Sequence, residues 1–322
     1  FVLKDGSTYK MWYTGHDTYS IYYATSSNGL EWTKYDNTVP ALSDGICTNG
    51  KIPHGNAGRG DASYTWYPAV IKDGSTNKMW YSGYFGGVYT IFYATSTNGG
   101  LTWTKYDNTI PAISDDSSTN GKIPMGSSGR GDSTYVLTPS VIKDDGIYKM
   151  WYTGNGGGTI CVYYATSSNG LEWTKYDNGI PDNSDGSSTN GKVPRGSSGK
   201  GDSLSASTPC VIKVGSAYKM WYVGSDAGNT ARVYHATSSN GLEWTKLDNS
   251  IPLVSDTTNS NSRLGLGTAG KGDSKYASHP KVVIANDRWN SYQMWYSGYD
   301  GANWRVYHAI SPPPAGTIFT FR

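Results

Sequence analysis

The chain has 322 residues and a formal net charge of +2, and it contains 27 Tyr, 12 Trp and 41 Gly. Its charges form no acidic or basic run, which gives no electrostatic reason to expect nucleic acid or an anionic membrane as a partner. No apolar stretch of about 18 residues is present, so we expect no membrane-spanning segment. Many aromatic residues combined with many Gly, Ser, Thr and Asn are typical of short strands joined by turns.

Four short segments recur in one order along the chain, each aromatic or β-branched and each bounded by turn residues. In chain order they read P-x-V-I-K (strand A, supplied first by residues 1–4), Y-K-M-W-Y (B), Y-Y-A-T-S (C) and L-E-W-T-K (D). Asp-Gly turns join A to B, and Ser-Asn-Gly turns join C to D. The M-W-Y-x-G motif of strand B shows the period, because it begins at Met11, Met79, Met150, Met220 and Met294, at spacings of 68, 71, 70 and 74 residues.

This pattern predicts an all-β chain that folds as a five-bladed β-propeller, with four antiparallel strands per blade and repeats of about 70 residues. We expect one domain over 1–322, with blades at 1–36, 62–107, 134–177, 204–248 and 275–322. We expect the Trp residues of strands B and D to fill the space between blades. Because the chain starts inside a repeat, it is interpreted as processed or truncated there. The last repeat lacks L-E-W-T-K, and 317–322 is predicted to be its fourth strand, the alternative being that 311–316 is a linker.

One face of this predicted propeller is where the repeats differ. The B–C loops and the D-to-A crossovers lie on that face, and each crossover runs about thirty residues, which is typical of a functional or locally structured segment. Aromatic faces stack on sugar rings, so aromatic residues at this rim are candidates for ligand contact. The candidate ligand-binding residues are His16, Trp66, Tyr67, Tyr84, Tyr299 and Trp304.

The segments P-x-V-I-K-D-G, Y-K-M-W-Y-T-G and I-Y-Y-A-T-S-S-N-G-L-E-W-T-K-Y-D-N, with an upstream G-x-G-D, resemble the repeat of the five-bladed propeller glycosidase superfamily. That superfamily includes arabinanases, β-xylosidases, levansucrase/invertase enzymes and mannoside phosphorylases. The resemblance covers essentially the whole chain. It implies carboxylates at the central funnel, with an Asp on an innermost strand, often directly before a Pro, and a Glu as the general acid.

The sequence departs from that implied active site. The residue before the strand A Pro is Tyr67, Thr138, Thr208 or His279, and never Asp. The three Glu residues, Glu31, Glu172 and Glu243, all occupy the C–D hairpin, on the face opposite the funnel. Glycoside cleavage needs two carboxyl groups about 5 to 10 Å apart. The usual pair is therefore absent from the expected positions.

An unusual acid–base centre at the rim is the catalytic alternative. Asp17, Asp226 and Asp300 lie in B–C loops, and His279 enters the last strand A, so an Asp together with a His is the candidate catalytic group. The structural alternative is that these Asp residues cap turns.

The crossovers carry two further recurring motifs. The S-D-x-x-x-T-N-G-K motif contains Asp44, Asp115 and Asp185, whose oxygens are candidate Ca²⁺ ligands, although turn formation explains the same residues. The G-[R/K]-G-D motif ends at Asp61, Asp132, Asp202 and Asp273, and two copies contain Arg-Gly-Asp, the tripeptide read by integrins. We interpret this motif as repeat architecture in which the Asp satisfies loop amides.

These observations favour an extracellular or cell-surface propeller that recognises carbohydrate and lacks the usual glycosidase carboxylates. The first alternative is a glycoside hydrolase of furanosidase or arabinanase type that uses rim Asp residues. The second is a structural or adhesive surface protein. We expect no cofactor apart from Ca²⁺ as an option, and the sequence predicts no oligomeric state. The three cysteines, Cys47, Cys161 and Cys210, show no metal-ligand spacing.

Overall fold

A computed structural model describes the chain except for residues 17, 257, 286–290, 312–318 and 322. The described residues form strands and turns without a helix, which confirms the all-β prediction. In that part of the chain there is accordingly no helix with the length and apolarity to cross a membrane. Contacts divide the chain into unit 1 (Phe1–Gly157 and Tyr164–Gly179) and unit 2 (Gly158–Tyr163 and Ile180–Arg322).

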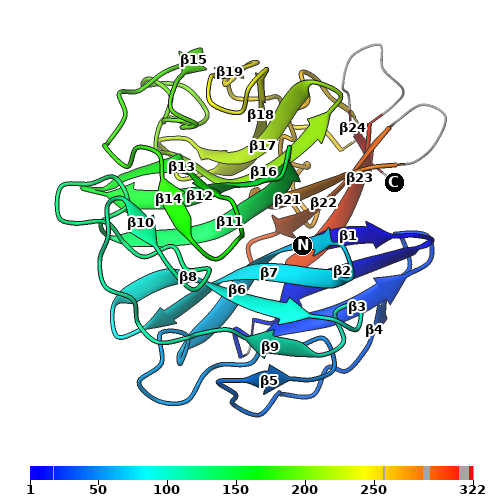
Figure 1. Cartoon of the computed structure of the whole chain (residues 1–322). Coiled ribbons are helices and arrows are strands. Elements are labelled where there is room, and N and C mark those ends of the chain that lie inside the picture. The colour runs from blue at the N-terminus through cyan, green and yellow to red at the C-terminus, as the bar shows by residue number, and fades with distance from the viewer. Residues whose placement is uncertain (17, 257, 286–290, 312–318, 322) are drawn as a thin grey trace. The chain divides into compact units, whose positions relative to one another are not determined.

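Unit 1 contains two sheets that each correspond to one predicted repeat (Figure 1). The first has the order β1 (Val2–Asp5), β2 (Thr8–Thr14), β3 (Ile21–Ser26), β4 (Thr33–Lys34). The second has the order β5 (Ile46–Cys47), β9 (Trp103–Lys105), β8 (Val88–Ser96), β7 (Thr76–Phe85), β6 (Tyr64–Asp73). The third repeat supplies the antiparallel pairs β11 (Tyr135–Asp144) with β12 (Ile147–Gly156), and β10 (Ser117–Ser118) with β14 (Trp173–Lys175). Strand β13 (Thr159–Ser167) spans the boundary between the two units.

Unit 2 contains two sheets of the same design. One has the order β16 (Ser205–Val214), β17 (Ala217–Ser225), β18 (Ala231–Ser238), β19 (Trp244–Lys246), β15 (Ser187–Ser188). The other has the order β21 (Tyr276–Ile284), β22 (Tyr292–Tyr299), β23 (Trp304–Ile310), β24 (Phe319–Phe321), β20 (Thr258–Asn259). The pairing of Ala309 with Phe321 confirms the predicted fourth strand of the last repeat over Phe319–Phe321. The linker alternative, 311–316, lies almost entirely outside the described residues.

The long crossovers are locally structured, as predicted, and each adds a fifth strand to the sheet that follows it. Strands β5, β10, β15 and β20 pair with the outermost strands β9, β14, β19 and β24. A second contact holds each crossover to the preceding strand C, through the bridges Ile21–Ile52, Ile91–Ile123, Val162–Val193 and Val233–Leu264. These short strands were not predicted from the sequence.

The repeated Trp residues form the core, as predicted. Those of strand B are at most 3% exposed: Trp12, Trp80, Trp151, Trp221 and Trp295. In unit 1 they pack edge-on against the strand D Trp of the next repeat, with ring centroids 5.7 Å apart for Trp12–Trp103 and 5.6 Å for Trp80–Trp173. Trp103, Trp173 and Trp244 are at most 1% exposed, whereas Trp32 of the first repeat is only half-buried.

Strand A of the last four repeats contains a β-bulge at its Pro. The register shifts between Trp66/Ala69, Leu137/Ser140, Ser207/Cys210 and Ser278/Lys281. The residue before each Pro has a left-handed backbone, with φ of 51° at Tyr67 and Thr138 and 52° at Thr208 and His279. This conformation costs an L-residue about 1–2 kcal/mol. In unit 1, hydrogen bonds from the Tyr67 and Thr138 amides to Thr14 Oγ1 (3.3 Å) and Ser82 Oγ (3.0 Å) hold it in place.

Candidate functional site

Unit 1 carries a continuous group of stacked rings where strands A, B and C of the second repeat meet the B–C loop of the first. We call this group the aromatic cluster, and its members are His16, Tyr19, Tyr64, Trp66, Tyr67, Tyr84, Tyr89 and Tyr135. Antiparallel register places Tyr64 opposite Tyr84 and Tyr84 opposite Tyr89, with ring centroids 5.3 and 4.4 Å apart. Rings in these cross-strand positions stabilise one another and form a preorganised surface.

A cavity of about 340 Å³ opens beside the aromatic cluster. The rings of Tyr19 and Tyr64 form part of its wall, and Thr18, Ser20 and Ser63 contribute hydroxyl groups. The remaining lining residues are Val39, Pro40, Leu42 and His54. This combination of apolar surface and a few convergent polar groups is typical of a small-molecule site. No carboxylate is among these lining residues.

His54 is a lining residue that the sequence did not single out. Burial lowers the pKa of its imidazole, which is therefore neutral near pH 7. Its Nε2 atom is buried and has no hydrogen-bond partner among the described residues, so it can bond to a ligand hydroxyl. The available sequence signal was the varied residue before Gly in the crossover, which is His54, Met125, Arg195 or Leu266.

The predicted ligand-binding residues fall into two groups. The structure brings His16, Trp66, Tyr67 and Tyr84 together in the aromatic cluster of unit 1, whereas Tyr299 and Trp304 stack on each other in unit 2, with centroids 4.8 Å apart. Burial raises the pKa of Tyr67 to about 12, so its hydroxyl stays protonated. The sequence did not identify Tyr19, Tyr64, Tyr89, Tyr135 and Tyr276, although Tyr64, Tyr135 and Tyr276 occupy one position of the repeat.

The candidate catalytic Asp residues that the structure describes make the contacts of turn caps. Asp226 accepts hydrogen bonds from the Gly228 amide (2.9 Å) and from Arg232 Nη1 (2.7 Å). Asp300 likewise accepts bonds from the Asn303 amide (2.7 Å) and from Arg305 Nη1 (2.6 Å). Asp17 lies outside the described residues.

These contacts keep both carboxyl groups ionised near neutral pH. Burial opposes ionisation of Asp226, but Arg232 and the backbone amides outweigh it and leave its pKa below the ordinary value. The Asn303 amide and then Arg305 lower the pKa of Asp300. A general acid in glycoside cleavage needs a raised pKa instead. Burial lowers the pKa of His279 to about 4, and its Nδ1 lies 2.9 Å from Ser278 Oγ, so this imidazole is neutral at pH 7.

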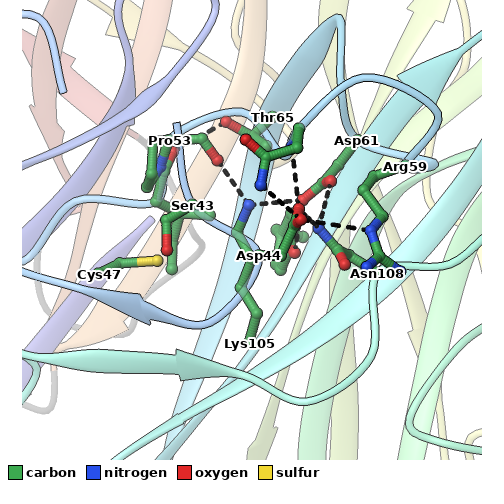
Figure 2. Close-up of polar contacts among 12 residues, drawn as sticks. Ser43, Asp44, Cys47, Pro53, Arg59, Asp61, Thr65, Lys105 and Asn108 are labelled. Carbon is green, nitrogen blue, oxygen red and sulfur yellow. Dashed lines mark hydrogen bonds and ion pairs between the residues drawn. The ribbon is translucent and has the colours of Figure 1, made fainter. Parts of the chain in front are cut away.

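The Asp of the G-[R/K]-G-D motif is the centre of a fully buried cluster (Figure 2). Lys105 Nζ lies 2.7 Å from Asp61 Oδ2 and also donates to the Pro53 carbonyl at 2.7 Å. The Tyr81 hydroxyl and the Asn108 amide each donate to Asp61 at 2.9 Å. Burial raises the pKa of Tyr81 well above its ordinary value, which keeps this hydroxyl a donor. The partners of Asp61 are therefore side chains, which corrects the expectation that it satisfies loop amides.

The same cluster recurs in two further repeats. Asp132 pairs with Lys175, and Asp202 pairs with Lys246, each at 2.7 Å, and in each pair the Asp side chain is 0% and the Lys 2% exposed. Tyr and Asn donors complete both clusters, as Tyr152 with Asn178 and Tyr222 with Asn249. Since Asp61 and Asp132 are 0% exposed, the Asp of each Arg-Gly-Asp copy is inaccessible to a receptor.

The candidate Ca²⁺ ligands take part in the same packing. Asp44, Asp115 and Asp185 each accept a hydrogen bond from the Asn of the buried cluster and from a backbone amide twelve residues along the chain. Burial opposes ionisation of Asp44, but these donors hold its pKa at about 2. Their oxygens thus face N–H donors, as turn formation requires. Among the described residues, no group of three or more His, Cys, Asp or Glu side chains could hold a metal ion.

Comparison with known proteins supports the fold and leaves the activity open. No family model matches the chain. The chain is 34% identical over 131 residues to the uncharacterised protein MT1551 of Mycobacterium tuberculosis CDC 1551, covering 38% of each protein. It is 32% identical over 123 residues to Rv1502 of strain H37Rv, covering 35% of the chain and 36% of that protein. The matched segments thus span little more than a third of these curated relatives.

Three solved structures have the same fold over nearly the whole chain. A thermostable family-43 glycoside hydrolase has a TM-score of 0.66 at 18% identity, over 99% of this chain and 90% of the other. The Cellvibrio cellulosa α-L-arabinanase complexed with arabinohexaose has 0.57 at 12%, over 99% and 93%. A member of the GH130 family of mannoside phosphorylases, which contains glycoside hydrolases acting on β-1,2 mannosidic linkages, has 0.60 at 18%, over 98% and 84%. The chain shares the propeller fold of the glycosidase-like superfamily, which confirms the resemblance seen in the repeats.

Proposed function

We propose that this chain is a carbohydrate-recognising, five-bladed β-propeller whose binding site is the cavity and aromatic cluster of unit 1. The single observation that carries the proposal is the composition of the cavity. Its 340 Å³ are lined by Tyr19 and Tyr64, by three residues with hydroxyl groups and by His54, with no carboxylate.

These groups suit the two surfaces of a sugar. The faces of a sugar ring present C–H groups, which pack on the flat rings of Tyr19 and Tyr64, and the edges present hydroxyls. Those hydroxyls can exchange hydrogen bonds with Thr18, Ser20 and Ser63, and with the unpartnered Nε2 of His54. A site with such groups already in place loses little conformational entropy on binding. The names of the solved structures that share the fold, an arabinanase and a mannosidic-linkage hydrolase among them, support carbohydrate as the ligand class.

Binding to soluble arabinan, xylan and mannan, measured by affinity electrophoresis and calorimetry, tests the proposal. We expect Tyr64→Ala to weaken binding to the recognised polysaccharide at least tenfold, which is about 1.4 kcal/mol. The matched control is Tyr176→Ala, which removes an exposed Tyr of unit 1 outside the aromatic cluster and should leave affinity unchanged. Binding by neither the parent chain nor the control to any of the three polysaccharides would overturn the proposal.

A glycoside hydrolase is the second candidate, and the observation that favours it is the fold shared with hydrolases. It requires Asp226 or Asp300 to act outside its ion pair with Arg232 or Arg305. Release of reducing ends from the same three polysaccharides separates the two candidates. Turnover that Asp226→Asn or Asp300→Asn abolishes would establish the hydrolase, and binding without turnover supports recognition alone.

Extracellular or cell-surface location is a further part of the proposal, since polysaccharides of this kind are found outside the cell. An adhesive role through Arg-Gly-Asp has no support, because both Asp residues are buried. Detection of the protein in the medium or on the surface of its source cells, against a cytoplasmic marker, tests the location.

A further inference from the structure

Unit 2 carries its own group of stacked rings, made by the last repeat. Tyr276 of β21, Tyr299 of β22 and Trp304 of β23 lie in one cross-strand row, and we call them the unit 2 platform. The Tyr276 and Tyr299 centroids are 5.6 Å apart with planes at 10°, and those of Tyr299 and Trp304 are 4.8 Å apart at 25°. The three rings therefore form one nearly flat surface.

This row repeats the register of the aromatic cluster in unit 1. Tyr276 opposite Tyr299 opposite Trp304 corresponds to Tyr64 opposite Tyr84 opposite Tyr89. The sheet does not need rings at these positions, because the fourth repeat has the row Ser205, Ser225 and Ala231 there, in the same register. The aromatic side chains in the last repeat thus serve something other than the pairing of its strands.

The platform is accessible and rigid. Trp304 is 47% exposed, and Tyr276 and Tyr299 are half-buried beneath it. The Tyr299 hydroxyl donates to the Gly301 carbonyl at 2.7 Å, which fixes the ring. Asp300 holds the adjoining turn through the Ala302 amide (2.7 Å) and Arg305. Ordering these rings for a ligand therefore costs little entropy.

We propose that the unit 2 platform is a second carbohydrate-binding site, made of unit 2 residues alone, which stacks one face of a sugar ring on Trp304 and Tyr299. The ligand class rests on the function proposed above, whereas the site rests on its own geometry. An open platform contacts only one face, so it suits a ring within a longer chain, while the cavity of unit 1 surrounds its ligand on several sides. Two sites on one chain give bivalent binding to a polysaccharide, whose repeated units raise avidity without any new contact.

Fluorine NMR of protein labelled with 5-fluorotryptophan tests this site directly. Trp66 reports on unit 1 and Trp304 on unit 2, and the variants Trp66→Phe and Trp304→Phe assign the two resonances. The probes are arabinohexaose, xylohexaose and a β-1,2-mannotetraose, each titrated to saturation or to about 10 mM. We expect both resonances to shift with the same probe, and calorimetry to detect two sites per chain, of which Trp304→Ala removes one.

Each outcome decides between the proposals. A shift of Trp66 without Trp304 overturns the second site and leaves the unit 1 site standing. A shift of Trp304 without Trp66 supports the platform and overturns the unit 1 site, and no shift with any probe overturns both. The matched control for Trp304→Ala is Val306→Ala, on the same face of the same strand and 52% exposed, which should leave both sites intact. Circular dichroism of the two variants verifies that each is folded.

Discussion

The first and second sheets of unit 1 place the same residues in opposite environments. In the second sheet Lys105, Tyr81 and Asn108 are at most 3% exposed and surround Asp61. In the first sheet the counterparts Lys34 and Asn37 are exposed and Tyr13 is half-buried. Strand β4 has no fifth strand beside it, and no Asp precedes β1 in this sequence. One repeat sequence thus becomes core or surface according to whether a crossover with its Asp packs on it.

The largest expected effect comes from removing the buried carboxylate. Asp61→Ala leaves the Lys105 ammonium buried without its charge partner, which typically costs about 3–5 kcal/mol. Urea unfolding monitored by tryptophan fluorescence measures the loss. The matched control is Lys34→Met in the first sheet, which removes an exposed ammonium and should change the unfolding free energy by less than about 0.5 kcal/mol. Equal losses in the two variants would show that burial does not separate the two sheets.

A smaller effect should follow from filling the space that the buried cluster occupies. A Cβ on Gly196 would lie against Asp202 Oδ1 and 2.7 Å from Asn249 Nδ2. Gly196→Ala is therefore expected to destabilise the chain by about 1–3 kcal/mol, the usual cost of overpacking. Gly186→Ala is the control, because a Cβ there meets nothing within 4 Å. A thermal melt that ranks Gly186→Ala below Gly196→Ala would contradict the packing of the Asp202 cluster.

The smallest expected effect depends on pH and concerns a Trp-packed position of the repeat. His235 stacks on Trp221, with centroids 4.7 Å apart, where the first three repeats carry Tyr23, Tyr93 and Tyr164. Burial lowers the pKa of His235 to about 3, from 6.5 in the unfolded chain. Below pH 6.5 only the unfolded state takes up this proton, so the stability present above pH 6.5 is lost as the pH falls toward 3.

We expect His235→Tyr to remove this part of the pH dependence. Between pH 7 and pH 5 the parent chain should lose about 1–2 kcal/mol more than the variant. Urea unfolding at both pH values measures the difference. A variant that follows the parent at both pH values would show that His235 takes up its proton in the folded state as well.

The strands of the repeats could be predicted because each segment carries its own pattern, with period-two apolar residues and Gly or Asn turns at its ends. Strand β5 could not, since the segment around Ile46–Cys47 is polar and pairs only because the crossover lies on β9. The pairing of Asp61 with Lys105 spans 44 residues, and nothing in either local motif indicates it.

The candidate site was predicted in part for the same reason. Trp66, Tyr67 and Tyr84 were identified because they stand outside the repeated core positions. Tyr19 and His54 were not, since their place in the cavity depends on how a loop and a crossover fold over the sheet. The turn-capping contacts of Asp226 and Asp300 were foreseen as an alternative, and their Arg partners follow in the next strand.

The β-bulge before each strand A Pro bears on how readily such a chain changes its chemistry. Asp and Asn tolerate a left-handed backbone better than most residues, and Thr, which is β-branched, tolerates it poorly. Yet Thr138 and Thr208 adopt φ of 51° and 52°, as do Tyr67 and His279. The surrounding strands therefore impose the conformation whatever the side chain. Each bulge is a socket into which a carboxylate could be introduced by one codon-level substitution, such as Thr138→Asp, with no rebuilding of the backbone around it.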